Sequence, residues 1–442
     1  MFLVARQYTI RNIVSISKAA ESFSDTILTA GTGTCRHEPV NNASFFKSQK
    51  AAFCSSKNGG EGGEDNNKSE QLVTITIEEA QSTTTNALKK LGWDDYDATL
   101  QAEIMVSAEI CGNNQGLVKM YQPALMAPHQ KSGKPTIERD TNTSSVVNAN
   151  QAPGMLAAVT AVDLAASKIL GNGIDSTERP PTGAKQLQEV ISSIEGRPTI
   201  SIVSSYNSST SSGRLALYCE RLAKRGLIGI GIAGSPEFVA AAPGGRPVLG
   251  TNPIAIAFPL SGSNDGGSND IFSFDMSTSA ISLYGVLTAK SKGIPLPPNV
   301  AYNSSGEWTT DADVALGRNG GSIATFGGGH KGVGLSLCVE ILAGALSGAA
   351  VLGTAGTSPT KKEAKSWGHT FVAIDPSQLV DDFPLRVESI VRAIRQSSDM
   401  GMVRIPGERS IQTAKQRLAE GTLPIPRKVW ETIKDTAKHG LK

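Results

Sequence analysis

The sequence predicts an α/β protein in which a helical lobe lies beside a domain built on a β-sheet. From residue 72 onward, short apolar segments typical of strands alternate with segments whose apolar residues recur at helical spacing. Glycine is abundant, at 46 of 442 residues, which suits a sheet protein with many tight turns. A chain of this length that is 39% hydrophobic can bury a large core and divide into more than one lobe.

The first expected elements are a strand at 72–77 and two helices at 78–91 and 96–111, the second capped by Asp94 or Asp95. Further helices are expected at 154–170, 213–225, 383–395 and 429–438, and further strands at 199–203, 227–233, 254–258 and 271–275. A helix at 331–344 has apolar positions on more than one face, so we expect it to be buried. Residues 172–183 and 261–270 have the composition of loop insertions.

The first part of the chain differs in composition from the rest. Arg6, Arg11 and Lys18 precede the first acidic residue, Glu21, and apolar residues recur there on one helical face. This composition is typical of an organelle transit peptide, which we expect to be mitochondrial, although an irregular N-terminal extension is the alternative. The resulting division is a transit peptide at 1–57, a linker at 58–70, an N-terminal helical lobe at 71–135, a sheet domain at 136–402 and a C-terminal segment at 403–442 that packs on the helical lobe.

Charge and cysteine content exclude several classes of function. The net charge is only +2 and the basic residues are scattered, so nothing supports nucleic-acid binding. The five cysteines show no paired spacing, so neither a disulfide framework nor a metal site is expected. No stretch is long and apolar enough to span a membrane.

The most informative segment is a glycine-built turn that presents one lysine. Residues 328–334 read Gly-Gly-His-Lys-Gly-Val-Gly, and an apolar run of helical length follows. Glycines allow close backbone approach to a ligand, and Lys331 offers a point charge to a phosphate or carboxylate. An ordinary turn before a buried helix is the alternative interpretation.

Three other segments accompany this turn. Residues 244–259 read Gly-Gly-Arg-Pro-Val-Leu-Gly-Thr-Asn-Pro-Ile-Ala-Ile-Ala-Phe-Pro, residues 275–279 read Asp-Met-Ser-Thr-Ser, and Pro-Gly-Glu occurs at 406–408. In this order the segments resemble the malate/L-lactate dehydrogenase family of the second type, whose members are NAD(P)-dependent oxidoreductases unrelated in fold to the usual lactate and malate dehydrogenases. The resemblance extends from about Leu72 to the C-terminal end.

The resemblance implies a non-Rossmann, mixed-sheet domain that binds NAD or NADP and a small 2-hydroxy or 2-oxo acid such as malate or lactate. It also implies a homodimer with clefts formed between subunits. Residues 229–234, Gly-Ile-Gly-Ile-Ala-Gly, fit the dinucleotide pattern G-x-G-x-x-G, but these glycines lie inside an apolar strand instead of turning a strand into a helix. We therefore discard the Rossmann interpretation.

Several residues match the cofactor-facing positions of the family. By resemblance, the cofactor would be contacted by Ser235, Asp275, Met276, Ser277, Lys331, Pro406, Gly407 and Glu408. For Asp275 a cap at a strand end is the alternative role, and for Glu408 the alternative is a solvated loop charge.

The catalytic side departs from the family. Two family turns each bring a histidine to the cleft, but here Gln115 takes the first place and a serine near Ser208 the second. A family arginine becomes Lys119, and a family lysine becomes Gly285, preceded by Tyr284 in the place of a glycine. Lys119 would then hold the substrate carboxylate, or act as a base if burial lowers its pKa.

A histidine is the usual base for a hydroxyl proton, and only His129, His330 and His369 lie within the folded body. His330 is the best candidate, because it adjoins Lys331; a surface histidine is its alternative interpretation. The leading hypothesis is a dehydrogenase that uses Lys119 and His330. The alternatives are a catalytically lapsed homologue that binds cofactor or a partner, and a structural subunit that has lost cofactor binding.

Overall fold

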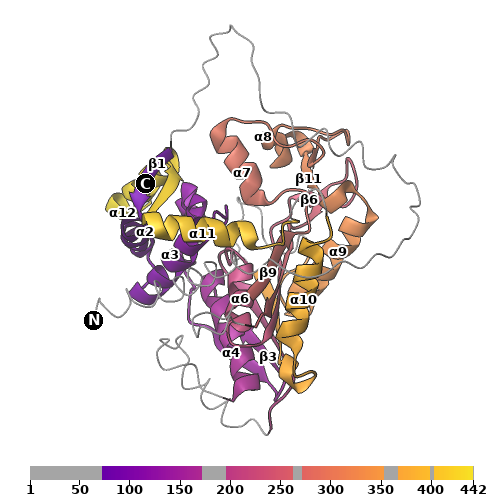
Figure 1. Ribbon diagram of the computed structural model, residues 1–442. Helices are drawn as coiled ribbons and strands as arrows, with labels where there is room; N and C mark the ends of the chain where they lie inside the picture. Colours follow the sequence, from indigo (N-terminus) through magenta and orange to yellow (C-terminus); the bar gives the residue numbers. More distant parts are fainter. Residues whose placement is uncertain (1–71, 172–195, 262–270, 353–366, 399–402, 442) are drawn as a thin grey trace, which may run out of the picture. The chain divides into compact units, whose positions relative to one another are not determined.

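The computed structural model describes residues 72–171, 196–261, 271–352, 367–398 and 403–441 (Figure 1). The expected leader and linker, most of both expected loop insertions and Met402 lie outside these ranges. The division of the chain at 135 and 402 remains a prediction.

The two ends of the described chain meet in one helical assembly. Strand β1 (Leu72–Thr76) pairs antiparallel with β13 (Thr422–Pro426), and helix α12 (Arg427–His439) packs on α2 (Ile77–Leu91). Helix α3 (Asp95–Ile110) packs on α2 and contacts α11 (Glu408–Glu420). Of the two candidate caps, Asp94 is the one used, because its carboxylate accepts a hydrogen bond from Asp97 N at 2.8 Å.

The central sheet has seven strands in the order β2-β3-β4-β12-β5-β8-β9. Their bounds are Thr136–Asp140, Ser144–Asn148, Ile200–Ser208, Trp367–Ile374, Ile228–Ala233, Pro253–Pro259 and Ile271–Ser277, respectively. Only the β3–β4 pair is parallel; every other neighbouring pair in this sheet is antiparallel. The prediction of a mixed, non-Rossmann sheet is confirmed.

The glycines of strand β5 serve helix packing. A Cβ on Gly229 would lie 2.8 Å from the backbone oxygen of Cys219, and one on Gly231 would lie 2.8 Å from the Cys219 sulfur. Helix α6 (Ala216–Ala223) can therefore approach the strand only because these two positions lack side chains. The G-x-G-x-x-G pattern is thus a close strand–helix contact.

Helices cover both faces of the sheet (Figure 1). Helices α4 (Gly154–Leu170) and α6 pack against β4, β12, β5 and β8 in the main hydrophobic core. Ile230 and Ile232 alternate with the glycines of β5, and they pack with Val339 of α9 (His330–Glu340) on the opposite side. Helix α10 (Phe383–Arg395) lies there too, where Phe383 contacts Phe258 of β8.

The expectation that the helix at 331–344 is buried all round is wrong for this chain. Helix α9 continues as a π-helical turn (Ile341–Ala345), and only one side of this rod packs on the sheet. Leu337, Ile341 and Leu346 are each about half exposed, at 44%, 51% and 54%. The helix is apolar, as predicted, but part of its apolar surface remains exposed.

A second, smaller sheet has four strands in the order β10-β11-β6-β7, with bounds Ala301–Tyr302, Ser322–Ala324, Val239–Ala240 and Pro247–Leu249. Helices α7 (Leu283–Lys292) and α8 (Ala312–Ala315) complete its separate hydrophobic core. Short 3-10 turns at Leu117–Tyr121, Pro123–Met126, Arg318–Gly320, Phe326–Gly328 and Pro376–Gln378 join the larger elements.

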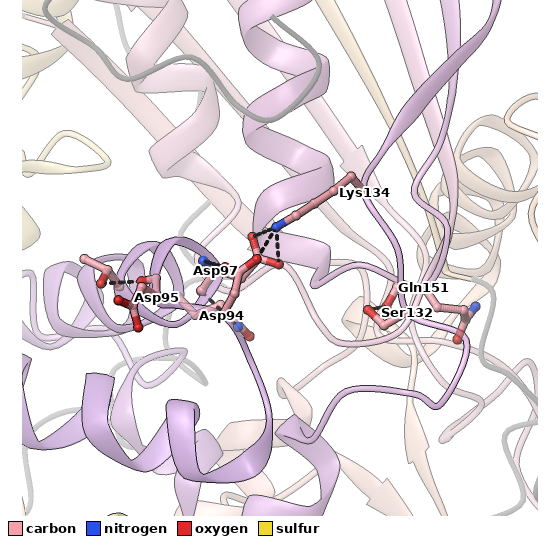
Figure 2. A network of polar contacts seen from close by, with 8 residues as sticks. Asp94, Asp95, Asp97, Ser132, Lys134 and Gln151 are labelled. Atoms are coloured by element: carbon pink, nitrogen blue, oxygen red, sulfur yellow. Dashed lines mark hydrogen bonds and ion pairs between the residues drawn. The ribbon is translucent and has the colours of Figure 1, made fainter.

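A polar network anchors the loop that precedes β2 to the helical assembly. Lys134 lies between Asp94 and Asp97, with its amine 2.6 Å and 3.1 Å from their carboxylates (Figure 2). Two residues earlier, Ser132 Oγ donates to the backbone oxygen of Gln151 at 2.9 Å. The network therefore connects the start of α3 with the turn that leads into α4.

Candidate active site

Lys119 lies in the 3-10 turn η2 (Leu117–Tyr121) that follows the turn at 112–116. Glu109, in the last turn of α3, accepts a hydrogen bond from Leu117 N at 2.8 Å and so fixes the start of η2. Burial raises the pKa of the Glu109 carboxyl to about 7, even though the Leu117 N–H and the charge of Arg417 act in the opposite direction. Local structure thus directs the Lys119 side chain into the protein.

The Lys119 amine is buried but fully engaged. Lys119 is only 2% exposed, and its Nζ donates to Ser211 Oγ at 2.8 Å and to Gln115 Oε1 at 3.2 Å. Nζ also lies 3.7 Å from the centroid of the Tyr284 ring. Burial lowers the pKa of the amine below its ordinary value, while the charge and hydrogen bonding of Tyr284 act to raise it.

Tyr284 reaches Lys119 from the first turn of α7. Ser282 caps this helix, since its hydroxyl accepts from Gly285 N at 3.1 Å, and it also accepts from Asn114 Nδ2 at 3.5 Å. A side chain at Gly285 would meet Ile281 Cγ1 at 2.9 Å. The lysine that the family resemblance places at Gly285 would therefore require its neighbour to move, whereas Tyr284 fills the space over Lys119.

The loop at 209–215 connects this cluster with the sheet. Thr210 Oγ1 accepts from Gly154 N at 3.1 Å, and a Cβ on Gly154 would lie only 2.1 Å from the Thr210 backbone oxygen. The next residue, Ser211, receives the Lys119 amine, and Tyr218 holds the Ser212 backbone oxygen at 2.5 Å. Each turn of the loop is therefore fixed by a different element.

Asp275 lies in strand β9 near its C-terminal end and contacts the residue that follows the same loop. Its Oδ2 accepts from Ala216 N at 3.1 Å and so caps the start of α6, whereas the alternative role expected from the sequence was a cap at a strand end. Solvent reaches the residue, yet the protein packed around its carboxyl raises the pKa, against the Ala216 N–H and the charge of Arg214. Asp275 can cap the helix and still face a ligand.

The loops expected to face a cofactor adjoin one another. The backbone oxygen of Ser235 lies 2.4 Å from where a Gly250 Cβ would be, so the two turns are in close contact. Thr278, which follows Met276 and Ser277, donates through its N–H to Thr251 O at 2.9 Å and accepts from Phe326 N at 2.9 Å. Phe326 in turn opens the glycine turn before Lys331.

At the end of that turn, His330 and Lys331 begin helix α9 and are both exposed. Gly327 and Gly328 have positive φ angles of 68° and 63°, which accounts for glycine at these positions. Within the described ranges, no hydrogen bond or ion pair joins His330 to Lys119. His330 therefore lies on the loops that the resemblance places at the cofactor, and it has no such contact with the Lys119 cluster.

The late Pro406-Gly407-Glu408 turn lies against strand β9. A Cβ on Gly407 would lie 2.8 Å from the Ser273 backbone oxygen, and the φ of Gly407 is 91°. Glu408 forms an ion pair with Arg395 and accepts from Ile405 N at 3.0 Å. Glu408 is therefore a paired residue that closes its own turn, and not a free loop charge.

The remaining histidines do not reach the cluster. His369 is in the middle of β12, 2% exposed, where its Nδ1 lies 3.1 Å from Ser205 Oγ. Burial lowers its pKa to about 4, so it stays neutral at ordinary pH. His129 Nδ1 accepts from Lys131 N at 3.2 Å in an exposed loop.

The structure corrects one position and adds two. Ser208, expected where the second family histidine would be, is buried and donates to the Trp367 backbone oxygen at 3.0 Å. The residue that faces Lys119 is Ser211, two residues before Gly213, and the family's Asn-Ser-x-His-x-Gly spacing counted back from Gly213 would have found it. Nothing in the sequence pointed to Tyr284 as a contact of Lys119.

Two features are absent from the described residues. No cluster of three or more His, Cys, Asp or Glu side chains there could hold a metal ion. In the same ranges, no helix has the length and apolar character needed to cross a membrane.

The mostly antiparallel sheet, the adjoining loops and the buried cluster around Lys119 together define a dehydrogenase-like α/β protein. The chain belongs to the malate/L-lactate dehydrogenase family, whose model matches residues 183–434. It is 31% identical over 374 residues to L-sulfolactate dehydrogenase of Methanothermobacter thermautotrophicus, covering 83% of this chain and 97% of that protein. The predicted family and enzyme class, an oxidoreductase, are therefore confirmed.

Two further relatives show the range of proteins that this chain resembles. The chain is 34% identical over 226 residues to Delta(1)-pyrroline-2-carboxylate reductase of Pseudomonas fluorescens, covering 49% of this chain and 61% of that protein. The solved sulfolactate dehydrogenase of Methanocaldococcus jannaschii superimposes with a TM-score of 0.64 at 26% identity, covering 83% of this chain and 97% of that one. The named substrates of these relatives differ, so family membership alone does not fix the substrate.

Proposed function

We propose that this protein transfers a hydride between a nicotinamide cofactor, NAD or NADP, and a small 2-hydroxy acid of the malate or lactate type. One observation carries the proposal. Segments that are distant in sequence, around Ser235, Thr278 and Phe326, are joined to one another by backbone contacts, and they lie next to helix α7, which contributes to the Lys119 cluster. The resemblance of the same segments to cofactor-contacting positions, and the names of the relatives, support it.

The residues at these loops fit a dinucleotide. Lys331 is exposed beside bare glycine backbone, which suits an anionic phosphate, and the Asp275 carboxylate is an accessible hydrogen-bond acceptor. When bound, the cofactor would supply or accept the hydride. The protein's own part would be to orient the acid, exclude water and move one proton at the C2 oxygen.

A fluorescence titration of NADH and NADPH into the purified full chain tests the binding half of this proposal. We expect saturable binding of at least one of them, accompanied by a rise in Tm, because a ligand that binds only the native state stabilises it. No binding and no rise in Tm with either would revive the structural subunit as the better interpretation. A panel of 2-oxo acids, with a cyclic imino acid included because of the reductase relative, then tests turnover.

A catalytically lapsed cofactor-binding homologue remains the second candidate. The observation that favours it is the absence of histidine at Gln115 and at Ser211, together with Gly285 in the place of a lysine. The double variant Gln115→His, Ser211→His separates the two. A large gain in rate would indicate a lapsed site, whereas an unchanged or lower rate is expected if another group already moves the proton.

We also propose a homodimer. The apolar surface of α9 and its π-helical turn, with Leu337, Ile341 and Leu346 about half exposed, is suited to burial against a second copy of this chain. Light scattering after size exclusion should give twice the 46.2 kDa mass of the chain, and Ile341→Lys should lower it. A monomeric wild-type protein would contradict this proposal.

The proposed location is the mitochondrion, supported by the early basic residues Arg6, Arg11 and Lys18 before the first acid. Import of the full chain into isolated mitochondria, with cleavage upstream of Leu72, is the expected result. A chain that stays outside and uncleaved would leave the N-terminal segment as a plain extension.

A further inference from the structure

Lys119 is not placed to meet a substrate directly. Two of the hydrogen bonds that its amine can donate go to Ser211 and Gln115, and the Tyr284 ring covers it at 3.7 Å. A residue that is 2% exposed cannot offer its charge to an incoming carboxylate without breaking this arrangement. The arginine-like role that the resemblance implies for Lys119 is therefore poorly supported by its contacts.

Tyr284 is the accessible member of the pair. It is half-buried, whereas Lys119 is 2% exposed, so solvent reaches the tyrosine side chain more readily than the amine. Residues 275–277, which the resemblance places at the cofactor, precede it on the chain, and Asn114 of the turn that also holds Gln115 donates a hydrogen bond to Ser282, two residues before the tyrosine. A phenol at this position can both donate and accept a proton.

The surroundings favour the charged form of this phenol. The Lys119 amine lies 3.7 Å from the centroid of the ring, and its positive charge attracts the negative charge of a phenolate more strongly where water is excluded. The first turn of α7, in which Tyr284 lies, adds the positive end of a helix dipole. In the described structure, no acidic side chain is hydrogen-bonded to Lys119 or forms a salt bridge with it, so its charge is directed at the ring.

We propose that Tyr284 is the proton-transfer residue of this site and that Lys119 is a positioning residue that acts through it. The assignment rests on the proposed oxidoreductase function and names the group that replaces the missing histidines. In the reducing direction, the C2 carbon receives a hydride from the nicotinamide, and the phenol O–H bond breaks as its proton passes to the C2 oxygen. The phenolate left behind is held by the Lys119 ammonium until a solvent proton restores it; oxidation runs the same steps in reverse.

The pH dependence of tyrosine absorbance tests the proposal without any turnover. In the wild-type full chain, we expect one tyrosine to ionise well below the ordinary pKa of about 10. That ionisation should be lost in Tyr284→Phe and should move upward in Lys119→Met, while Lys119→Arg should largely keep it. If no tyrosine ionises early, or if Tyr284→Phe leaves the early ionisation in place, the assignment is overturned.

Kinetics supply the second test once a substrate has been found. Tyr284→Phe should lower kcat about 100-fold or more, as expected for loss of a general acid, with little change in KM or in the Kd of NADH. Lys119→Met should move the basic limb of the kcat profile to higher pH. Tyr206→Phe is the matched control, because its hydroxyl donates a hydrogen bond to the exposed residue Glu138 at 2.8 Å, and its kcat should not change. A Tyr284→Phe enzyme that keeps full kcat would refute the assignment even though the protein is a dehydrogenase.

The two measurements separate the proposal from the function on which it rests. A wild-type protein that binds NADH but turns over no acid contradicts the proposed function, and with it the catalytic role of Tyr284, whatever the tyrosine titration shows. Thermal melts of the variants check their folding, since Tyr284→Phe keeps the ring over Lys119 and should change Tm little.

Discussion

By resemblance, the loops that carry Asp275 and Lys331 keep the family's segments, whereas the cluster around Lys119 has Gln115 and Ser211 where the resemblance implies histidines. The burial of the two lysines shows the opposite order. Lys331 is exposed, but Lys119 is buried, with two hydrogen bonds and an aromatic ring over it. Keeping an amine in the interior costs free energy unless its partners are maintained. We propose that a site with these partners intact is one rebuilt around other residues, in which the chemistry does not require the two histidines.

The largest expected effect comes from a substitution that disrupts the packing around the Lys119 cluster. Gly154→Ala would place a Cβ 2.1 Å from the Thr210 backbone oxygen, so the loop that carries Ser211 has to move. We expect a loss of about 3 kcal/mol or more in the free energy of unfolding, measured by urea denaturation. Gly334→Ala in α9 is the control: nothing lies within 4 Å of its Cβ, so it should be neutral or slightly stabilising. Equal stability of the two variants would contradict the tight loop contact.

The pH dependence of stability tests the packing of the central sheet around His369. The folded-state pKa of His369 is about 4 against an ordinary 6.5, so between these values the unfolded chain binds a proton that the folded chain does not. Stability should therefore fall as the pH is lowered through this window, by about 3 kcal/mol in all. His369→Gln should lack this contribution, and denaturation of both proteins at several pH values measures it. Parallel curves for the two would show that His369 is not held neutral.

Asp275→Asn sharpens the comparison by separating two roles of one residue. If Asp275 contacts the cofactor, the Kd of NADH or NADPH should rise about 10-fold, since a hydrogen bond to a charged group contributes about 1.5–3 kcal/mol. Asp313→Asn, a surface acid paired with Lys290, is the matched control and should leave the Kd unchanged. A lower Tm with an unchanged Kd would instead make Asp275 only the cap of α6.

The smallest effect concerns the network of Figure 2. Lys134→Met removes the amine that joins Asp94 to the buried Asp97. Because this amine is partly exposed, we expect a loss of about 1 kcal/mol in unfolding free energy and an unchanged Kd for NADH. A large fall in cofactor affinity would mean that the helical assembly controls the cofactor loops more directly than the contacts indicate.

How far the sequence predicted each region follows from where its determinants lie. Helix α4 was predicted with its observed bounds, because its alanine-rich periodicity and Gly171 are local signals. Helix α6 is shorter than predicted, since residues 213–215 belong to the loop near Asp275. In the run of serines and threonines at 208–212, the prediction fell on the neighbourhood of Ser208. The tertiary contact with Lys119 selects Ser211, which is where the family spacing falls when it is counted back from Gly213.

Tyr284 was missed for a similar reason. Its sequence position indicated only a substituted glycine, and its proximity to Lys119 depends on how α7 and η2 are brought together. The exposed face of α9 was missed because periodicity reports apolar character and not what covers it. The cofactor-facing residues, by contrast, could be named because they match contiguous segments, although their roles remain predictions.

The most direct test of the central claim is the rate at which the wild-type full chain oxidises NADH and NADPH in the presence of oxaloacetate, pyruvate or sulfopyruvate. A rebuilt site predicts saturable turnover with at least one acid, at a rate that Gln115→His with Ser211→His does not raise. Tight cofactor binding with no turnover on any of these acids, and a rate gained only when both histidines return, would contradict the account.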